Sequence, residues 1–380
     1  MKVLINSTTA FIGGGVQVGV SFAKYIFNND PGFDFIFAIS KPIYDNLPDY
    51  IRDNDKIRVF EVSPSKIFKG RSERKRIREI ENYFKPDFIY SLAFPSYVSF
   101  KTKEIGRYTN PWEIFKAETA WSLLSRKEKI LRSLKNTYRL YWARRAEFYE
   151  TQTISAKHAI SKKFDCNEEK ILVSPNVLNP LFENIQNVDY KKNNLTKKNK
   201  VKLFCLSADH KHKNLKIIPK VIKQIKKIGT DKKFQFILTL PQKSDTLREI
   251  LEESKKDNNH KYIRNVGPLS LSDCVDWYTK IDLVFLPTVL EVFSATYLEA
   301  MKFKKVIITS DMDFSRETCG DAAIYFKAND YIDAAQKIIR AMLDQNFSNK
   351  VVKNIDNQIK KFPGFEQKHQ EIVNWILKLK

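Results

Sequence analysis

Two glutamates, Glu291 and Glu299, are separated by seven residues and follow an apolar run that ends at Pro287. Ser294 lies between them and is a residue typical of a helix N-cap. The first amides of a helix, with the positive end of its dipole, favour phosphate or diphosphate. A helical rise over eight positions separates the carboxylates by up to about 12 Å. One carboxylate could accept hydrogen bonds from sugar hydroxyls, and the other could accept them from a ribose diol on the far side of a diphosphate. The alternative is that both are ordinary surface glutamates without a ligand.

A run of glycines follows the first apolar segment. Gly13, Gly14 and Gly15 come after the expected strand 2–6, and Gly19 follows four residues later. This spacing does not satisfy G-x-G-x-x-G and disfavours a nicotinamide-dependent dehydrogenase. The loop instead indicates a strand, turn and helix opening, with the helix expected over 16–27.

The order of apolar segments predicts two α/β domains. In the first half, strands are expected at 33–39 and 86–90 around a helix at 71–84; in the second, strands are expected at 201–206, 234–240, 282–286 and 306–309. Alternation of this kind is typical of parallel sheets covered by helices on both faces, and 380 residues suffice for about two domains. We predict an N-terminal domain over 1–185, a linker over 186–200, a C-terminal domain over 201–365 and a terminal helix over 366–380.

The block from Asp282 to Met301 resembles the retaining glycosyltransferases of family 4, whose signature is a pair of glutamates separated by seven residues. Phe293 and the run Leu298–Met301 match as well, and Gly13–Val16 is similar to the family's first glycine loop. The resemblance implies the α/β GT-B fold, in which two Rossmann-like doubly wound domains face each other across a cleft. Lys213 and Asn214 match a Lys-Asn pair of the same family.

The resemblance also assigns roles to residues of this chain. It implies a catalytic pair that stabilises charge at the donor sugar and the leaving diphosphate, Glu291 and Lys213. It further implies donor-binding residues, namely Glu299, which would bind the ribose, and Phe293, Ser294, Asn214, Gly14, Gly15 and Asn110. For Asn110, a plain turn stabilised by Asn-Pro is the alternative.

Two departures from the family pattern bear on the donor. Residues 292–294 read Val-Phe-Ser where most members have Gly-Phe-Gly, and Ala208 stands where an Arg is usual. Without that Arg, Lys213 is expected to neutralise more of the negative charge of the diphosphate, helped by Lys211.

The function implied is a metal-independent retaining hexosyltransferase that uses a nucleotide diphosphate sugar as substrate and needs no separate cofactor. The acceptor is expected to be a carbohydrate or a polyprenyl-linked glycan, as in surface polysaccharide, O-antigen or lipopolysaccharide synthesis. A GT-B nucleotide-sugar epimerase is one alternative. The motif Asp311-Met312-Asp313 matches Asp-x-Asp by three residues only, and we predict no metal.

The formal charge of +22 raises the question of partners. A basic nucleic-acid-binding protein is the rival class, but no helix-turn-helix, zinc-finger or RNA motif is present, and we expect no nucleic acid partner. Residues 126–145 combine basic side chains with apolar ones at helical spacing. Such a helix could lie on an anionic membrane, or pack its apolar stripe on the sheet. We therefore expect a cytoplasmic protein, peripheral at the inner face of the membrane, and no apolar run long enough to span it.

Overall fold

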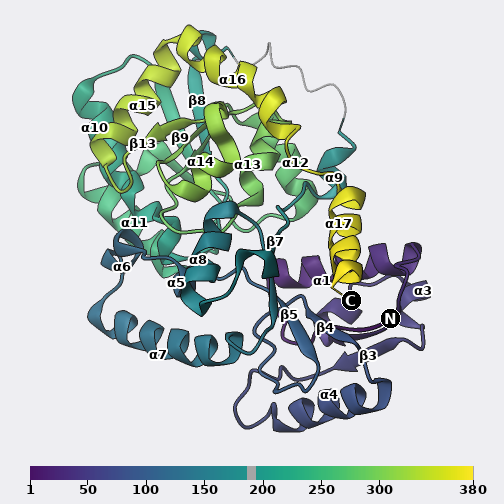
Figure 1. Cartoon of the computed structure of the whole chain (residues 1–380). Helices are drawn as coiled ribbons and strands as arrows, with labels where there is room; N and C mark the ends of the chain where they lie inside the picture. Colours follow the sequence, from purple (N-terminus) through teal and green to yellow (C-terminus); the bar gives the residue numbers. More distant parts are fainter. Residues whose placement is uncertain (186–193, 380) are drawn as a thin grey trace. The chain divides into compact units, whose positions relative to one another are not determined.

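The computed structural model describes residues 1–185 and 194–379. By internal contacts the chain divides into two compact units (Figure 1). Unit 1 comprises Met1–Phe115, Ile130–Pro175 and Glu366–Lys380, and unit 2 comprises Lys116–Lys129 and Asn176–Phe365. The chain therefore passes between the units several times, and residues 186–193 of the predicted linker lie outside the described residues.

Unit 1 is built on a parallel sheet of seven strands in the order β3-β2-β1-β4-β5-β6-β7. Its strands are buried and lie between helices, which is the usual state of an all-parallel sheet. In sheet order they are β3 (Ile57–Phe60), β2 (Asp34–Ser40), β1 (Lys2–Ser7), β4 (Phe88–Ser91), β5 (Lys103–Arg107), β6 (Phe148–Thr151) and β7 (Ile171–Val173). The helices are α1 (Gly14–Asn28), α2 (Lys41–Tyr44), α3 (Asp49–Arg52), α4 (Arg71–Phe84), α5 (Pro111–Ile114), α8 (Ile154–Phe164) and α17 (Phe365–Lys378), and α7 (Arg126–Ala143) enters from unit 2.

Unit 2 repeats the plan with six parallel strands in the order β10-β9-β8-β11-β12-β13. They are β10 (Ile263–Asn265), β9 (Lys233–Leu238), β8 (Lys200–Cys205), β11 (Leu283–Leu286), β12 (Val306–Ser310) and β13 (Ile324–Phe326). The helices are α6 (Glu118–Ser122), α9 (Pro180–Glu183), α10 (Ile218–Ile228), α11 (Asp245–Lys256), α12 (Leu271–Lys280), α13 (Ala295–Lys302), α14 (Asp313–Cys319), α15 (Tyr331–Leu343) and α16 (Gln345–Ile359).

The prediction of two doubly wound α/β domains is confirmed. In both sheets the first strand of the unit lies inside the sheet, so that the chain winds outward in both directions and creates a switch point at the carboxyl ends of the strands. Ligands bind at such points in this class of fold. In unit 2 the switch point lies between β8 and β11, which pair through Leu203 with Leu283 and Phe204 with Val284.

The terminal helix α17 packs on unit 1 although it follows unit 2 in sequence. Tyr25 of α1 donates its hydroxyl to the side-chain oxygen of Gln370 at 2.7 Å, and Trp375 packs edge-on against Phe148. Ile372, Val373 and Ile376 are buried, as the predicted amphipathic pattern of this helix requires.

Candidate active site

The loops after β8 and β11 meet at the carboxyl edge of the unit 2 sheet. The loop after β8 contains a short helical turn, Lys211–Lys213, and the backbone amide of Val289 in the other loop donates to the His212 carbonyl at 2.9 Å. This bond fixes the two loops against each other at the switch point. Side chains that are far apart in sequence are thereby brought together.

Lys213 and Glu291 form an ion pair at this point. The lysine Nζ donates to Glu291 Oε2, and the two side chains are 14% and 20% exposed. A partly buried pair of opposite charges is held more firmly than an exposed one, because solvent screens it less. The two residues that the sequence analysis named as catalytic are therefore direct neighbours.

Asn214 is buried directly after the lysine and adopts a left-handed backbone conformation with a φ of 53°. Asn tolerates this conformation better than most residues. Its Nδ2 donates to Oδ1 of Asn329 at 3.3 Å, which ties the β8 loop to the loop after β13. Lys211 forms a different ion pair, with its Nζ 3.4 Å from a carboxylate oxygen of Glu128.

Helix α13 begins where the sequence analysis placed it, with Ser294 at the N-cap position. The Ser294 side chain makes no capping hydrogen bond. Phe293 is buried, with its ring 5.8 Å from that of Phe362 in an edge-on contact. The helix is held to the sheet by the Tyr297 hydroxyl, which lies 2.8 Å from Thr309 Oγ1, while that Oγ1 donates to the Leu286 carbonyl at the end of β11.

Glu299 lies further along α13 and accepts a hydrogen bond from the Tyr278 hydroxyl at 3.0 Å. Burial raises the pKa of Glu299 from 4.5 to about 7, and the bond from Tyr278 partly opposes this shift. Burial also raises the pKa of Tyr278 well above 10, so that the phenol keeps its proton and donates it. A carboxyl group in this state is poised to accept from hydroxyl donors once it ionises.

The remaining predicted donor-binding residues lie in unit 1. Gly14 and Gly15 form the start of α1, and Gly13 before them has a φ of 65° that favours glycine. Asn110 is the N-cap of α5, where its Oδ1 accepts from the amide of Trp112 at 3.2 Å and its Nδ2 donates to Glu113. The alternative of a turn held by Asn110 is therefore present in the structure, and a role for these three residues at the donor stays a prediction.

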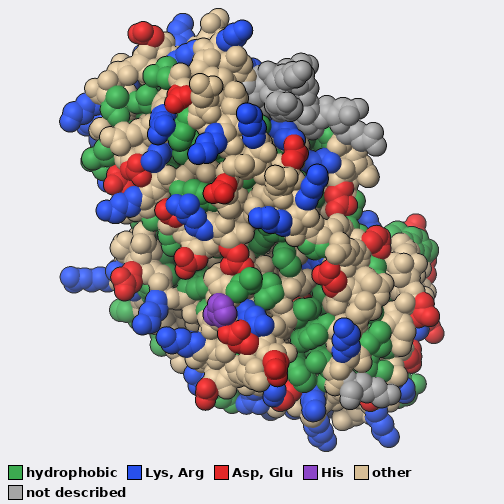
Figure 2. Space-filling view, turned by 45° about the horizontal axis from the view of Figure 1, so that its top comes forward, with side chains coloured by type: hydrophobic (Ala, Val, Ile, Leu, Met, Phe, Trp, Pro, Cys, Tyr) green, Lys and Arg blue, Asp and Glu red, His purple; other side chains and the backbone are tan. Residues whose placement is uncertain are grey.

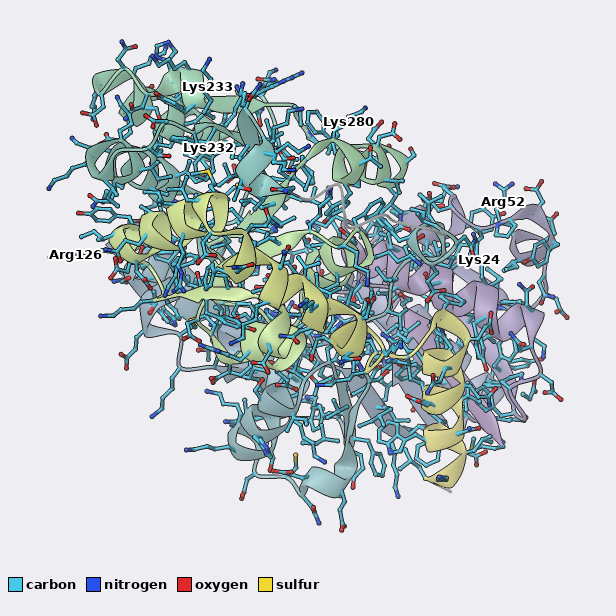
Figure 3. The ribbon with its side chains drawn as sticks, turned by 90° about the horizontal axis from the view of Figure 1, so that it is seen from above. Lys24, Arg52, Arg126, Lys232, Lys233 and Lys280 are labelled. Carbon is cyan, nitrogen blue, oxygen red and sulfur yellow. The ribbon has the colours of Figure 1, made fainter. Side chains whose placement is uncertain are left out.

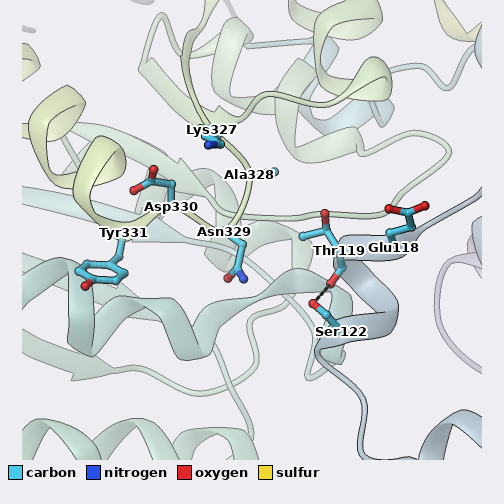
Figure 4. A pocket seen from close by; sticks show the side chains of 8 residues that line it. All are labelled: Glu118, Thr119, Ser122, Lys327, Ala328, Asn329, Asp330 and Tyr331. Atoms are coloured by element: carbon cyan, nitrogen blue, oxygen red, sulfur yellow. Dashed lines mark hydrogen bonds between the residues drawn. The ribbon is translucent and has the colours of Figure 1, made fainter.

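A hollow of about 530 Å³ lies within unit 2 beside the loop after β13 (Figure 4). The sequence analysis did not single it out. The sequence signal is the pair Asn329-Asp330, because Asp is a common N-cap residue. In the structure Asp330 caps α15 by accepting from the amides of Ile332 and Asp333. Because Asn329 also bonds Asn214, the hollow adjoins the Lys213 loop. It is lined by Glu118, Thr119, Ser122, Lys327, Ala328, Asn329, Asp330 and Tyr331.

The Asp311-Met312-Asp313 segment forms an ion pair rather than a cluster of acids. Both carboxylate oxygens of Asp311 accept from the Arg316 guanidinium at 2.7 Å. Within residues 1–185 and 194–379, no group of three or more His, Cys, Asp or Glu side chains is arranged to hold a metal ion. No helix in the same part of the chain is long and apolar enough to cross a membrane.

Comparison with known proteins agrees with this fold. Residues 187–358 match the family model described as glycosyl transferases group 1. No curated protein matches the sequence. Among solved structures, a glycosyltransferase from Rickettsia africae ESF-5 is similar over 100% of this chain and 99% of its own, with 16% identity and a TM-score of 0.70.

Two further solved structures have the same overall arrangement of elements. Sucrose-phosphate synthase from Thermosynechococcus elongatus is 14% identical, with 100% and 98% of the two chains covered and a TM-score of 0.71. Anabaena Alr3699/HepE in complex with UDP is 13% identical, with 100% of both chains covered and a TM-score of 0.71, and it has also been solved with UDP-glucose. The chain thus has the GT-B fold.

Proposed function

We propose that this protein is a retaining glycosyltransferase of the family 4 type, which transfers a hexose from a nucleoside diphosphate sugar to a carbohydrate acceptor. The observation that carries the proposal is the Lys213–Glu291 pair at the switch point of unit 2. It combines a fixed positive charge, suited to a diphosphate, with a carboxylate suited to sugar hydroxyls. The match of residues 187–358 to a glycosyltransferase family model supports the same class.

In the proposed reaction the bond between the anomeric carbon and the diphosphate oxygen breaks while the acceptor oxygen bonds to that carbon from the same face. The acceptor's proton passes to the leaving phosphate oxygen, so that no protein base is required. Lys213 would neutralise the charge that develops on the diphosphate, and Glu291 would stabilise positive charge on the sugar. Lysine supplies this charge without a metal ion, which is why the proposal is metal-independent.

Glu299 would bind the ribose diol as an ionised acceptor. Its raised pKa means that it ionises near neutral pH, and two hydroxyl donors from the ribose would favour the charged form. Phe293, Ser294 and Asn214 complete the proposed donor site in unit 2. The Anabaena protein's complex with UDP supports a nucleotide donor, and the acceptor is proposed to be a surface glycan carried on a polyprenyl lipid.

A thermal-shift panel tests the donor class. UDP, GDP, dTDP and their sugars are compared with duplex DNA as a control for the basic charge. A ligand at 100 times its Kd stabilises the folded state by about 2.7 kcal/mol, which should raise the Tm of a domain of this size by about 5–10 °C. We expect one nucleotide to do so in the wild type and not in Lys213→Met.

Lys220→Met is the matched control, because Lys220 is exposed on α10 of the same unit. A shift that survives Lys213→Met would contradict the proposed site. Salt-sensitive stabilisation by DNA without any nucleotide shift would favour the nucleic-acid alternative. In Figure 2, however, Lys and Arg side chains are interspersed with Asp and Glu, and the basic residues labelled in Figure 3 come from separate elements of both units.

A second assay distinguishes glycosyl transfer from epimerisation. Release of the nucleoside diphosphate should require the acceptor if the protein is a transferase, whereas an epimerase acts on the nucleotide sugar alone.

A further inference from the structure

Helix α7 (Arg126–Ala143) presents its polar side to the protein. Asn136 is buried and donates from Nδ2 to the Trp112 carbonyl at 2.9 Å. Arg139 forms an ion pair with the buried Glu113. The guanidinium of Arg132 lies 4.7 Å from the centre of the Trp112 ring. These contacts use the polar face of an amphipathic helix for packing, which reverses the usual orientation.

The apolar side of α7 consequently faces outward. At 100° per residue, five of its large apolar side chains fall on the side opposite Asn136, and they are 38–65% exposed. We call this set the α7 outer face, and its members are Ile130, Leu131, Leu134, Tyr138 and Tyr141. Leu140 and Trp142 are half-buried instead, and the Tyr138 ring also stacks on buried Tyr97 at 5.7 Å. The alternative that the apolar stripe packs on the protein therefore does not hold for the five side chains of the outer face, whereas Trp142 of the same stripe is half-buried and packs on Tyr97. The inner side of α7 is held instead by the contacts of Asn136 with the Trp112 carbonyl and of Arg139 with Glu113.

Basic residues surround the α7 outer face. Lys127 falls on the same side of the helix, and Arg126 and Lys135 are exposed beside it. Arg144 and Arg145 are exposed just past the last helical residue, where the Arg145 guanidinium lies over the Tyr141 ring. Glu128 is the single acid between positions 126 and 145. Its carboxylate is already engaged, since it accepts from the Ser125 amide at 2.8 Å.

A second exposed apolar site lies in the same unit. Ile67 and Phe68 are 63% and 89% exposed in the loop before α4, between Lys66 and Lys69. Beside α4, a hollow of about 460 Å³ is lined by basic and acidic side chains together, namely Lys75, Arg78, Glu79, Glu81, Asn82, Ser99, Phe100 and Lys101. Arg145, just past the end of α7, donates to Ser99 Oγ at 2.9 Å. The Arg145 bond thus connects the end of α7 to the segment that borders this hollow.

We propose that the α7 outer face lies in the headgroup region of an anionic lipid bilayer, with its apolar side chains inserted and the surrounding Lys and Arg on lipid phosphates. An 18-residue helix is about 27 Å long, which suits a helix lying in the plane of the interface. The charge argues against a second copy as the occupant, because Lys127 and Arg145 would meet like charges across a helix pair. Snorkelling basic side chains at the border of an apolar face are typical of interfacial helices.

Vesicle co-sedimentation of the full-length protein tests this proposal. The probes are vesicles of phosphatidylcholine alone and of phosphatidylcholine with about one-third phosphatidylglycerol. We expect the wild type to bind the anionic vesicles about tenfold more strongly or better, with binding that weakens as salt rises. Ile130→Ser with Leu134→Ser should reduce binding about tenfold or more at an unchanged Tm, because both side chains are exposed.

The matched apolar control is Ile228→Ser with Leu343→Ser, since both residues are similarly exposed in unit 2. Lys127→Gln with Lys135→Gln should reduce binding and flatten its salt dependence, whereas Lys220→Gln with Lys227→Gln should not. This second pair leaves the apolar face intact and keeps the test valid if the serine variant unfolds.

Three results would overturn the proposal. The first is equal binding to neutral and anionic vesicles, and the second is vesicle binding by the α7 variants that is as strong as that of the wild type. The third is a dimer that forms without lipid, as measured by sedimentation, and that is lost in the serine variant. The last result would assign the face to a second copy. No nucleotide or sugar is present in the assay, so its outcome is independent of the proposed glycosyl transfer.

Discussion

Replacing Glu291 by Gln should strengthen the binding of the nucleoside diphosphate while it abolishes sugar transfer. In the structure Lys213 already has a partner in Glu291, so a diphosphate must share this lysine or displace the carboxylate. Removing the negative charge frees the lysine and removes a repulsion from the phosphates. The sugar, in contrast, loses the carboxylate that is proposed to hold its hydroxyls.

The size of the effect follows from the burial of the pair. Opposite charges about 4 Å apart attract by about 4 kcal/mol at an effective dielectric constant of 20 and by about 1 kcal/mol in water. With side chains 14% and 20% exposed, the pair lies between these limits. If the interaction of Lys213 with the diphosphate becomes stronger by about 1–2 kcal/mol in Glu291→Gln, the affinity for the diphosphate rises about 5- to 30-fold. Lys213→Met removes charge-assisted hydrogen bonds of about 1.5–3 kcal/mol and should weaken the same ligand about 10- to 150-fold.

Isothermal calorimetry with the nucleoside diphosphate, followed by a transfer assay with its sugar, measures both effects. We expect Glu291→Gln to lower the transfer rate by about 100-fold or more. The Lys220→Met variant serves as the control for a lost surface lysine. If Glu291→Gln weakens the diphosphate as much as Lys213→Met does, the two side chains act as a structural pair and the assigned roles are refuted.

Three further outcomes are expected. Because the pKa of Glu299 is about 7 when folded and 4.5 when unfolded, ionisation destabilises the protein as pH rises between these values. Glu299→Gln should therefore be more stable than the wild type at pH 8 by about 1–3 kcal/mol and equal near pH 4 in denaturant titrations, yet bind the nucleotide more weakly by calorimetry. Tyr278→Phe removes a hydrogen bond that lowers this pKa, so the Glu299 carboxyl should titrate at a higher pH by carbon-13 NMR; an unchanged titration would contradict the contact. Gly70→Ala should destabilise unit 1 by about 1–3 kcal/mol, since its Cβ would lie 2.5 Å from the Lys66 carbonyl oxygen, and wild-type stability in urea would show that the loop can shift.

Much of the fold was predictable because buried parallel strands leave a direct trace in the sequence. Apolar runs marked β1, β2, β8, β9, β11 and β12, and helix α4 begins and ends at the residues predicted, Arg71 and Phe84. Short strands with mixed polarity were not predicted. β5 contains Lys103, Glu104 and Arg107, and its charged groups are accommodated by tertiary contacts such as the bond from Ser91 Oγ to Glu104 at 2.6 Å.

The candidate site was predictable in its residue types and only partly in its geometry. Sequence spacing fixed where Glu291, Ser294 and Glu299 fall relative to the start of α13, because a helix converts residue number into position. It could not show that Tyr278 of α12 bonds Glu299, or that Asn329 bonds Asn214, since these pairs come from different elements.

The sequence by itself determined the alternation of strands and helices, the two-domain organisation and the amphipathic character of α7 and α17, all of which depend on local periodicity. Tertiary structure alone decided which residues meet. Lys213 and Glu291 are 78 positions apart and become neighbours because β8 and β11 lie side by side and end at one edge of the sheet. In the same way, the contacts of Asn136 and Arg139 turn α7 so that its apolar face points outward, and α17 leaves unit 2 to pack on unit 1. The periodicity of a sequence shows that a helix has an apolar and a polar face, but which face is buried depends on the surrounding tertiary packing.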